Sequence, residues 1–491
     1  MDSSICTLKE FGAASRKYAL ALLSLLPGYV IGGPIVVPWV ILALMYSLQG
    51  RTLAIAELFV LWTFLGEGAY QYHLLGSAEG ENYVFYVQTI LLVTAIVTFL
   101  LSPKKESALA KRLRFLGYTM ILASVISGFV NYVDMQTLVK YLETYSWFFF
   151  SLAVLMSFSY QYSVKKLASL IVAILVMNSV LGFLQTTILP IQTTPDGYTP
   201  HLADAAVGLL GVGASQMLTD LCIAFASYFI LDYLMNRGKK NLGLAMLLAI
   251  QPVVSESKAA RLIGVALFIV VFLLALLRYR IISMNLKSLP KYAILVAVLW
   301  FGFKFSNNLN ESYFESSGGQ EATISKFLSQ KEALMDFGKI RGYVDAFTMI
   351  APRGNLGLAF GLGPRQFMYG MLENVPLFSN LGFIMDQGTA GRKSSVDFAV
   401  TDITVIIGEL GFIGFFFFCF GILRILLFYG RKISQANGNQ SKLSSLFIVQ
   451  LILLVSWNSF YYTGWDNALY FVPLTILMAV DQSISEGESR V

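Results

Sequence analysis

The sequence predicts an all-α, polytopic integral membrane protein. Of its 491 residues, 56% are apolar and only 13% are charged, whereas soluble domains have about 25% charged residues. The mean hydropathy is +0.67. The apolar runs are continuous over about 20 residues, which is the length of a membrane-spanning helix. The strands of a β-barrel would alternate instead, and this composition also excludes disordered, collagen-like and coiled-coil classes.

Cysteine and histidine content argues against disulfide, metal and cofactor chemistry. Cys6 lies in the N-terminal tail, and Cys222 and Cys419 lie inside apolar runs, so no disulfide framework and no CxxC pattern is present. The two histidines, His73 and His201, are too few for a histidine-built metal site. We therefore expect no metal and no cofactor. The net charge of +6 resides in short connections, so it does not indicate a nucleic-acid partner.

Fourteen apolar segments are candidate transmembrane helices. The first two are separated by a Gly-Gly-Pro break, and the ninth is short. A count of 12 to 14 spans is therefore expected. The segments cover residues 18–32, 34–48, 52–71, 83–102, 115–132, 145–161, 167–188, 216–234, 241–254, 262–277, 292–306, 401–429, 444–462 and 467–481.

The charges of the connections predict the orientation. Every second connection is basic, and these carry seventeen Lys and Arg residues, whereas the alternate short connections carry only Lys140, Lys258 and Arg261. Basic loops remain cytoplasmic because they resist translocation. An even number of spans then places both termini in the cytoplasm. The first apolar run is expected to be an uncleaved helix, because no small-residue cleavage site follows it.

A long loop divides the chain into three parts. We expect transmembrane helices 1–11 in residues 1–306, with a smaller outer loop at 189–215; a large outer loop at 307–400; and helices 12–14 with a cytoplasmic tail in 401–491. The large loop has eight basic and nine acidic residues, and loops of such length are usually functional. Helical periodicity from Thr323 to Ile350 predicts a helix that Pro352 terminates.

A short turn on the predicted outer face carries two cations. Lys258 and Arg261 lie where residues 255–262 lead into a helix, whose N-terminus is itself partly positive. This arrangement suits a phosphate or pyrophosphate. The alternative is that both side chains are interfacial anchors.

The large loop and the span after it hold the other candidates. Arg341 precedes Asp345 by four residues, a spacing that also fits a simple ion pair on a wet helix face. The stretch from Gly354 to Arg365 is too rich in glycine for the interior of an element, and it lacks the Lys-Ser/Thr of a nucleotide P-loop. Asp397 and Asp402 precede an apolar span that contains Glu409. Glycines 408, 411 and 414 around this glutamate are typical of helix packing.

In this order, the segments resemble the O-antigen polymerase (Wzy-type) and O-antigen ligase superfamily of bacterial inner membranes. The resemblance spans roughly 200–430. It rests on the Gly-rich segment from Asp204 to Ser215, the Ser257-Lys258 turn, the run from Arg341 to Pro352, the Gly361–Phe367 stretch and the Gly408–Gly414 stretch.

The resemblance implies a GT-C-like, inverting and metal-independent glycosyltransferase. Its substrate would be an undecaprenyl-pyrophosphate-linked oligosaccharide in the lipid bilayer, its site would be periplasmic, and a chain-length regulator is an implied partner. Lys258, where the family has arginine, would grip the pyrophosphate with Arg261 and Arg341. Asp204, Arg365 and Glu409 would contribute to substrate binding.

Three alternatives to an O-antigen-type polymerase remain open: a ligase, a flippase and a peptidoglycan-type polymerase. The ligase branch has a histidine near the end of the large loop, and none is present here, so Asp397 or Asp402 would act as the base. This favours polymerisation over transfer to lipid A core. A lipid-linked oligosaccharide flippase would be expected to show two related halves and no 94-residue outer loop. A peptidoglycan-type polymerase usually has about ten spans.

Overall fold

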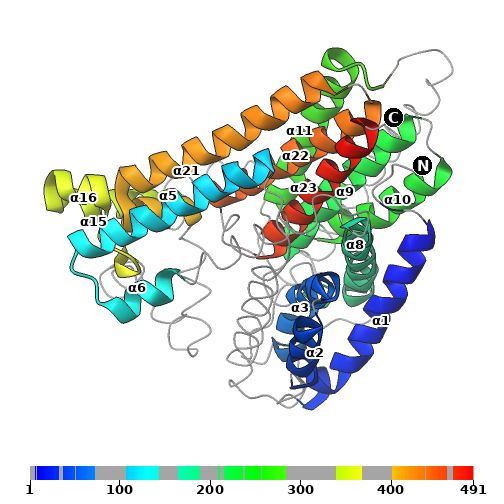
Figure 1. Ribbon diagram of the computed structural model, residues 1–491, viewed down its shortest axis with the longest axis horizontal. Coiled ribbons are helices and arrows are strands. Elements are labelled where there is room, and N and C mark those ends of the chain that lie inside the picture. Colours follow the sequence, from blue (N-terminus) through cyan, green and yellow to red (C-terminus); the bar gives the residue numbers. More distant parts are fainter. Residues whose placement is uncertain are drawn as a thin grey trace, which may run out of the picture.

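The computed structural model describes the chain as a bundle of helices (Figure 1). Within the residues that it describes, all regular secondary structure is helical, so the predicted all-α class is confirmed there. These residues are 6, 8–31, 37–49, 51–71, 107–142, 164–187, 208–210, 215–235, 238–255, 257–282, 339–367, 401–436, 438–461 and 468–489.

Most of the helices coincide with predicted apolar segments, and three helices, Met135–Leu142, Lys339–Ile350 and Gly354–Phe360, lie between such segments. In chain order the helices are α1 (Leu8–Ile31), α2 (Val37–Leu48), α3 (Thr52–Gln71), α5 (Ala108–Val130), α6 (Met135–Leu142), α8 (Val164–Thr187), α9 (Ser215–Leu234), α10 (Lys239–Val254), α11 (Lys258–Leu273), which continues as the π-helix η2 (Leu274–Arg278), α15 (Lys339–Ile350), the 3₁₀ turn η3 (Ala351–Arg353), α16 (Gly354–Phe360), α21 (Asp402–Gln435), α22 (Asn439–Tyr461) and α23 (Ala468–Ser489).

Eleven of the fourteen predicted spans coincide with helices. The other three, 83–102, 145–161 and 292–306, lie outside the described residues. Six of the described helices are long and apolar enough to cross a membrane, because about 20 residues at 1.5 Å each match the hydrocarbon thickness. The chain therefore has the architecture of a membrane-embedded helical protein. The six helices cover residues 108–130, 165–186, 215–234, 260–278, 402–435 and 439–460.

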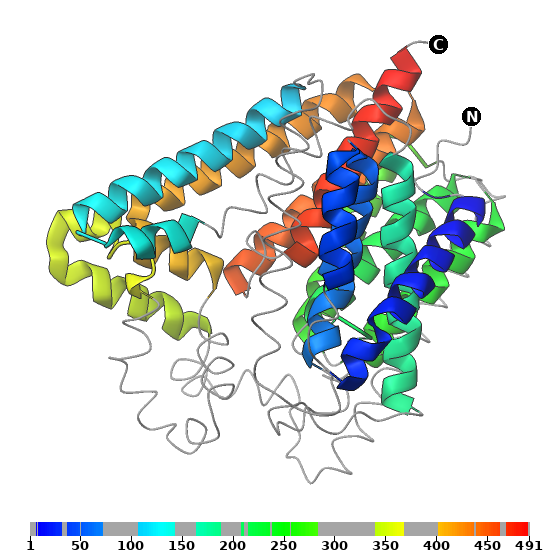
Figure 2. The same ribbon diagram turned by 60° about the horizontal axis from the view of Figure 1, so that its bottom comes forward.

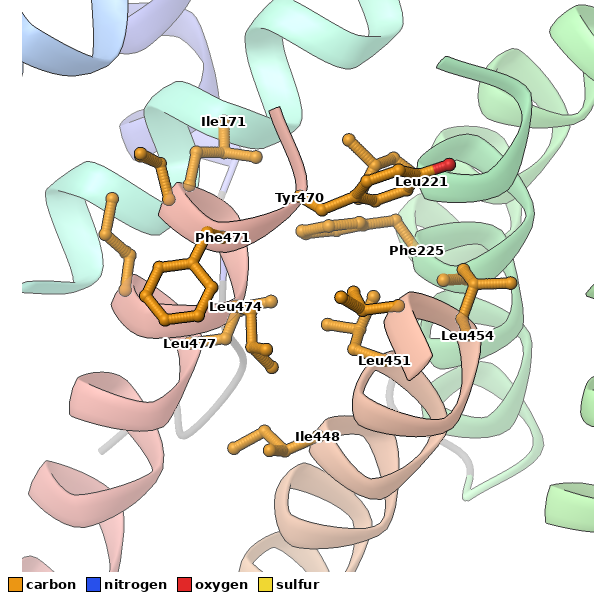
Figure 3. Packing of buried hydrophobic residues seen from close by; sticks show 14 of the residues in the cluster. Ile171, Leu221, Phe225, Ile448, Leu451, Leu454, Tyr470, Phe471, Leu474 and Leu477 are labelled. Atoms are coloured by element: carbon orange, nitrogen blue, oxygen red, sulfur yellow. The ribbon is translucent and has the colours of Figure 1, made fainter. Parts of the chain in front are cut away.

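The core of the bundle lies between α8, α9, α22 and α23. Figure 3 shows Phe225 of α9 beside Tyr470 of α23, with Leu451 of α22 directed into the same space. Most residues of α9 are buried, and a helix that is apolar all round is typically interior. These helices therefore form the centre of the described part of the bundle.

The pair α5 and α21 lies at one side of the bundle, where the two helices run side by side in both views (Figures 1 and 2). They are antiparallel: the side chain of Leu116, near the start of α5, packs against Gly421 in the second half of α21. Ser127, near the end of α5, contacts Glu409 near the start of α21.

Contacts between side chains group the helix ends into two sets, at opposite ends of the bundle. At the Lys432 end, Lys432 of α21 pairs with Asp481 of α23, and Gln482 of α23 donates to Ser107, which precedes α5. At the other end, Ser459 of α22 donates to Asp402 of α21. We call these the Lys432 end and the Asp402 end.

Three local predictions are corrected. The helix from Asp402 to Gln435 is interrupted at Gly411, which has φ +68° and ψ −167°, so Glu409 lies in a short segment before the break. Residues 354–360, predicted to be too rich in glycine for an element, form α16. The eight-residue helix α6 was not predicted. Pro352 does end the loop helix: α15 stops at Ile350, and its predicted first half, 323–338, lies outside the described residues.

Candidate functional site at the Asp402 end

Asp402 occupies the first helical position of α21. Thr401 caps this helix: its hydroxyl accepts from the Thr404 amide at 3.2 Å, and the Thr404 hydroxyl accepts from the Thr401 amide at 2.8 Å. A reciprocal cap of this kind defines where a helix begins. The Asp402 carboxylate is buried and accepts a 2.7 Å hydrogen bond from the Ser459 hydroxyl of α22. The helix N-terminus and this donor both stabilise the ionised carboxylate.

Tyr343 connects the loop helix α15 to this site. Its hydroxyl donates to the carbonyl oxygen of Phe460 at 2.7 Å and lies 3.3 Å from the Thr401 hydroxyl, which donates to it. Burial raises the pKa of the Tyr343 phenol, and the negative charge of nearby Asp402 adds to the rise. The helix that carries Arg341 is thereby anchored at the start of α21. The backbone of Arg341 lies in the first turn of α15, and its side chain is outside the described part.

A second buried carboxylate, Asp220 on α9, lies at the same end. One of its oxygens accepts from the Tyr470 hydroxyl at 2.6 Å and from the Asn458 amide at 2.7 Å. Gln216, one turn earlier on α9, donates to the Asn458 side-chain oxygen at 2.8 Å. Asp220 is not among the site residues predicted from the sequence. Its position inside the predicted 216–234 span could have identified it, since acidic residues within a membrane span are energetically costly and commonly functional.

The last turns of α22 join the two carboxylates. Asn458 contacts Asp220, and the next residue, Ser459, contacts Asp402. Successive residues of a helix point about 100° apart, so one helix can face two neighbours at once. The Asp402 end therefore contains a network that ties α9, α21, α22 and α23 together.

The turn with the predicted pyrophosphate cations lies beside the start of α9. The hydroxyls of Ser215, the first residue of α9, and Ser255 are 2.9 Å apart, and the Ser257 amide donates to Ser255 at 3.2 Å. Lys258 is the first residue of α11, as predicted, although its side chain is outside the described part. Arg261 follows one turn later and is half-buried.

The end of α10, which precedes this turn, contains two features that favour a kink. Pro252 lies inside the helix, and the Ser179 hydroxyl of α8 enters the backbone ladder, donating to the Leu247 carbonyl and accepting from the Gln251 amide at 3.0 Å. Proline and an inserted side chain are recognised causes of helix kinks. The two Ser179 hydrogen bonds join the last two turns of α10 to α8.

The two glycine-rich motifs of the resemblance are in contact. The amides of Leu362 and Gly363 donate to the carbonyl oxygens of Gly408 and Glu409, at 2.8 and 3.1 Å. The Ser127 hydroxyl lies 2.7 Å from the same Glu409 oxygen. These donors satisfy carbonyls that the helix break at Gly411 would otherwise leave without partners. The glycines here allow two backbone segments to approach within hydrogen-bonding distance, in addition to allowing helices to pack.

Arg365 and Glu409 flank this contact in different environments. Glu409 is fully buried, and Arg365 is half-buried with a positive φ of 62°, a conformation uncommon outside glycine. Asp345 of α15 is also buried, so it does not lie on the wet helix face that the sequence predicts for it.

The glycine-rich segment after the smaller loop is held by α8. The Gln185 side chain exchanges two hydrogen bonds with the Gly208 backbone, at 2.7 and 2.9 Å, and the Leu209 amide donates to Asn178 at 2.7 Å. Two other predicted site residues, Asp204 and Asp397, lie outside the described residues. Among the residues that are described, no group of three or more His, Cys, Asp or Glu side chains could hold a metal ion.

Comparison with known proteins adds no relative: no protein-family model and no curated protein matches this chain.

Proposed function

We propose that the chain is a polysaccharide polymerase of the O-antigen (Wzy) type in a bacterial inner membrane. It would be a GT-C-like protein of about 14 spans, with both termini cytoplasmic and its site periplasmic. It transfers a growing undecaprenyl-pyrophosphate-linked glycan onto a lipid-linked repeat unit. The observation that carries the proposal is the anchoring of α15 by Tyr343 beside Asp402, because it brings the loop helix of Arg341 to a buried carboxylate.

In this proposal the acceptor hydroxyl attacks C1 of the donor sugar while the bond from C1 to the pyrophosphate oxygen breaks. Asp402 or Asp397 accepts the proton of the attacking hydroxyl. The pyrophosphate leaves with the electron pair of the broken bond. Arg341, Arg261 and Lys258 neutralise the charge that develops on it. Attack on the face opposite the leaving group inverts the configuration at C1, and no metal takes part.

Ser459 has a positioning role in this scheme. Its hydrogen bond orients the Asp402 carboxylate, and Tyr343 binds the backbone of the adjacent Phe460. The loop helix and the base are therefore positioned by the same turn of α22. This coupling supports a site that is complete only when the large loop is docked, which would exclude the water that otherwise hydrolyses the donor.

The test is chain elongation by purified protein in lipid vesicles with lipid-linked repeat units, followed on a chain-length gel. We expect polymer from the wild type and none from Asp402→Asn or Asp397→Asn, whichever is the base, since the amide cannot accept the proton. Asp134→Asn is the matched control, because this carboxylate is exposed and should leave polymer unchanged. Ser459→Ala should shorten chains by lowering turnover.

Three results would contradict the proposal. Full polymer from both Asp402→Asn and Asp397→Asn would remove the aspartate base. Wild-type protein that moves lipid-linked units across the bilayer without lengthening them would be a flippase. Transfer to lipid A core, with no polymer, would make the protein a ligase.

A further inference from the structure

Three arginines line the seam between α5 and α21 at the Lys432 end. They are Arg112 of α5, and Arg424 and Arg431 of α21. The Arg424 guanidinium lies 4.3 Å from the ring centroid of Phe115 and 5.8 Å from that of Phe420. The Arg112 guanidinium lies 4.6 Å from the centroid of Phe428. We call these arginines, with the three phenylalanines, the arginine seam.

The spacing along both helices produces this arrangement. On α21, Arg424, Phe428 and Arg431 are four and three residues apart, so they share one face, and Arg112 and Phe115 are similarly placed on α5. Because the two helices are antiparallel, Arg112 of α5 stacks on Phe428 of α21, and Arg424 of α21 stacks on Phe115 of α5. The rings of Phe115 and Phe420, 6.0 Å apart and nearly perpendicular, complete the contact.

The two helices that form the seam supply no negative charge to balance its arginines. Neither α5 nor the part of α21 after Gly411 contains an Asp or Glu. Asp481 of α23 lies near this end, but its carboxylate is already paired with Lys432, the residue after Arg431. The contacts of Arg112 within the described chain are the Phe428 ring and the carbonyl oxygen of Ala108, at 2.7 Å, and Arg424 and Arg431 act on it electrostatically as like charges.

The seam also begins within an apolar surface. Phe420, Leu423 and Leu427 of α21 are 40, 50 and 53% exposed, which in a membrane-embedded helix means exposure to lipid. Arg424 lies among them, eleven residues before the end of α21 at Gln435, or roughly 16 Å along the helix. Arg431, nearer the helix end, is exposed. A cation among lipid-exposed apolar residues is costly unless an anion accompanies it.

We propose that the arginine seam is a binding site for the phosphate of an anionic phospholipid headgroup. The fixed, planar guanidinium groups suit bidentate contact with phosphate oxygens, and stacking on the phenylalanine rings holds Arg112 and Arg424 in place. The acyl chains would lie along Phe420, Leu423 and Leu427, and the headgroup would lie toward Arg431. The site is independent of the Asp402 end and of the reaction proposed there.

The test is lipid retention by the purified full-length chain, measured by native mass spectrometry. The probe lipids are phosphatidylglycerol, which is anionic, and phosphatidylcholine, which carries the same phosphate but no net charge. We expect the wild type to retain phosphatidylglycerol preferentially. The triple variant Arg112→Gln/Arg424→Gln/Arg431→Gln should bind it about 100-fold more weakly, since each basic residue near an anionic membrane surface contributes about fivefold.

The matched control is Arg16→Gln/Arg278→Gln/Arg280→Gln, which removes the same charge from three exposed positions elsewhere and should change retention little. If the first triple variant does not fold, Arg431→Gln replaces it. Arg431 makes no ring contact among the described residues, so this variant should fold and bind phosphatidylglycerol about fivefold more weakly.

Three outcomes overturn the proposal. The first is equal retention of both lipids by the wild type, and the second is equal loss in the seam and control variants. The third is displacement of the lipid by millimolar inorganic phosphate, which would assign the site to a soluble phosphate instead. Retention that is lost only in the seam variants, and that inorganic phosphate does not displace, supports a lipid headgroup.

Discussion

Gly361 lies directly against Gly411, although 50 residues separate them in the chain. A Cβ atom on Gly411 would lie 2.6 Å from the Gly361 amide nitrogen and 2.4 Å from the Ala359 carbonyl oxygen. Both glycines have positive φ, +69° and +68°. The break in α21 and the glycine-rich stretch after α16 therefore form one unit, and that unit positions Glu409 and Arg365.

Replacing Gly411 should disrupt this unit. Gly411→Ala places a side chain at φ +68° and ψ −167°, a region essentially restricted to glycine, which costs about 1–3 kcal/mol. The new Cβ atom also forces backbone apart, at about 1–3 kcal/mol more. We expect a clear fall in the melting temperature of the detergent-solubilised protein. The control is Gly243→Ala, at an exposed position of α10 with nothing within 4 Å of the new Cβ, which should be neutral or stabilising. Equal melting temperatures for the two variants would contradict the conclusion that the helix break requires glycine at position 411.

The Asp220 network should contribute to stability through Tyr470. Tyr470→Phe removes the hydroxyl that donates to Asp220 at 2.6 Å and keeps the ring that packs on Phe225 (Figure 3). Hydrogen bonds between membrane helices contribute about 0.6 kcal/mol on average and up to about 1.7 kcal/mol. We expect a loss in the free energy of unfolding within this range, measured by denaturation in mixed micelles. Tyr118→Phe, on an exposed position of α5, should show no loss.

Orientation can be tested with residues at the two ends of the bundle. In a background lacking Cys6, Cys222 and Cys419, the variants Asn355→Cys on α16 and Ser434→Cys near the end of α21 each place one thiol at an exposed position. An impermeant maleimide should label the first in intact spheroplasts and the second only after lysis, because basic connections remain cytoplasmic. The reverse pattern would invert the protein and place the Asp402 end in the cytoplasm.

Arg341 should be needed for the proposed reaction. Removing one fixed cation from a developing anion costs about 2.7–4 kcal/mol, so Arg341→Ala should slow polymerisation about 100- to 1,000-fold without lowering the protein level. Arg341→Lys should recover part of the activity, since lysine lacks the bidentate fork. The measurement is the initial rate of chain elongation.

Arg353→Ala is the matched control for this substitution. Arg353 is an exposed arginine of the adjacent turn that donates to Asn131 at 2.7 Å, and its loss should have little effect on elongation. Asp345 would not be a suitable control, because it is buried. Asp345→Ala should lower the amount of folded protein. Normal elongation by Arg341→Ala would leave the pyrophosphate to Lys258 and Arg261.

The sequence by itself determined the helical class and most helix positions. Membrane-spanning helices satisfy their own backbone hydrogen bonds, so a run of about 20 apolar residues is sufficient to predict one. Pro352 correctly predicted the end of α15, because proline has no backbone N–H to continue a helix. Lys258 and Arg261 were also recognisable from the sequence, because the other short connections of the predicted outer face carry only one further basic residue, Lys140.

Tertiary structure decided what those residues contact. The break at Gly411 depends on hydrogen-bond donors from Leu362, Gly363 and Ser127. The sequence alone does not distinguish a glycine that interrupts a helix from one that allows two helices to pack closely. Asp220 and Asp402 become parts of one network only because Asn458 and Ser459 of α22 face α9 and α21. Hydrogen bonds between distant segments depend on how helices pack, and the periodicity of a single helix carries no information about its neighbours.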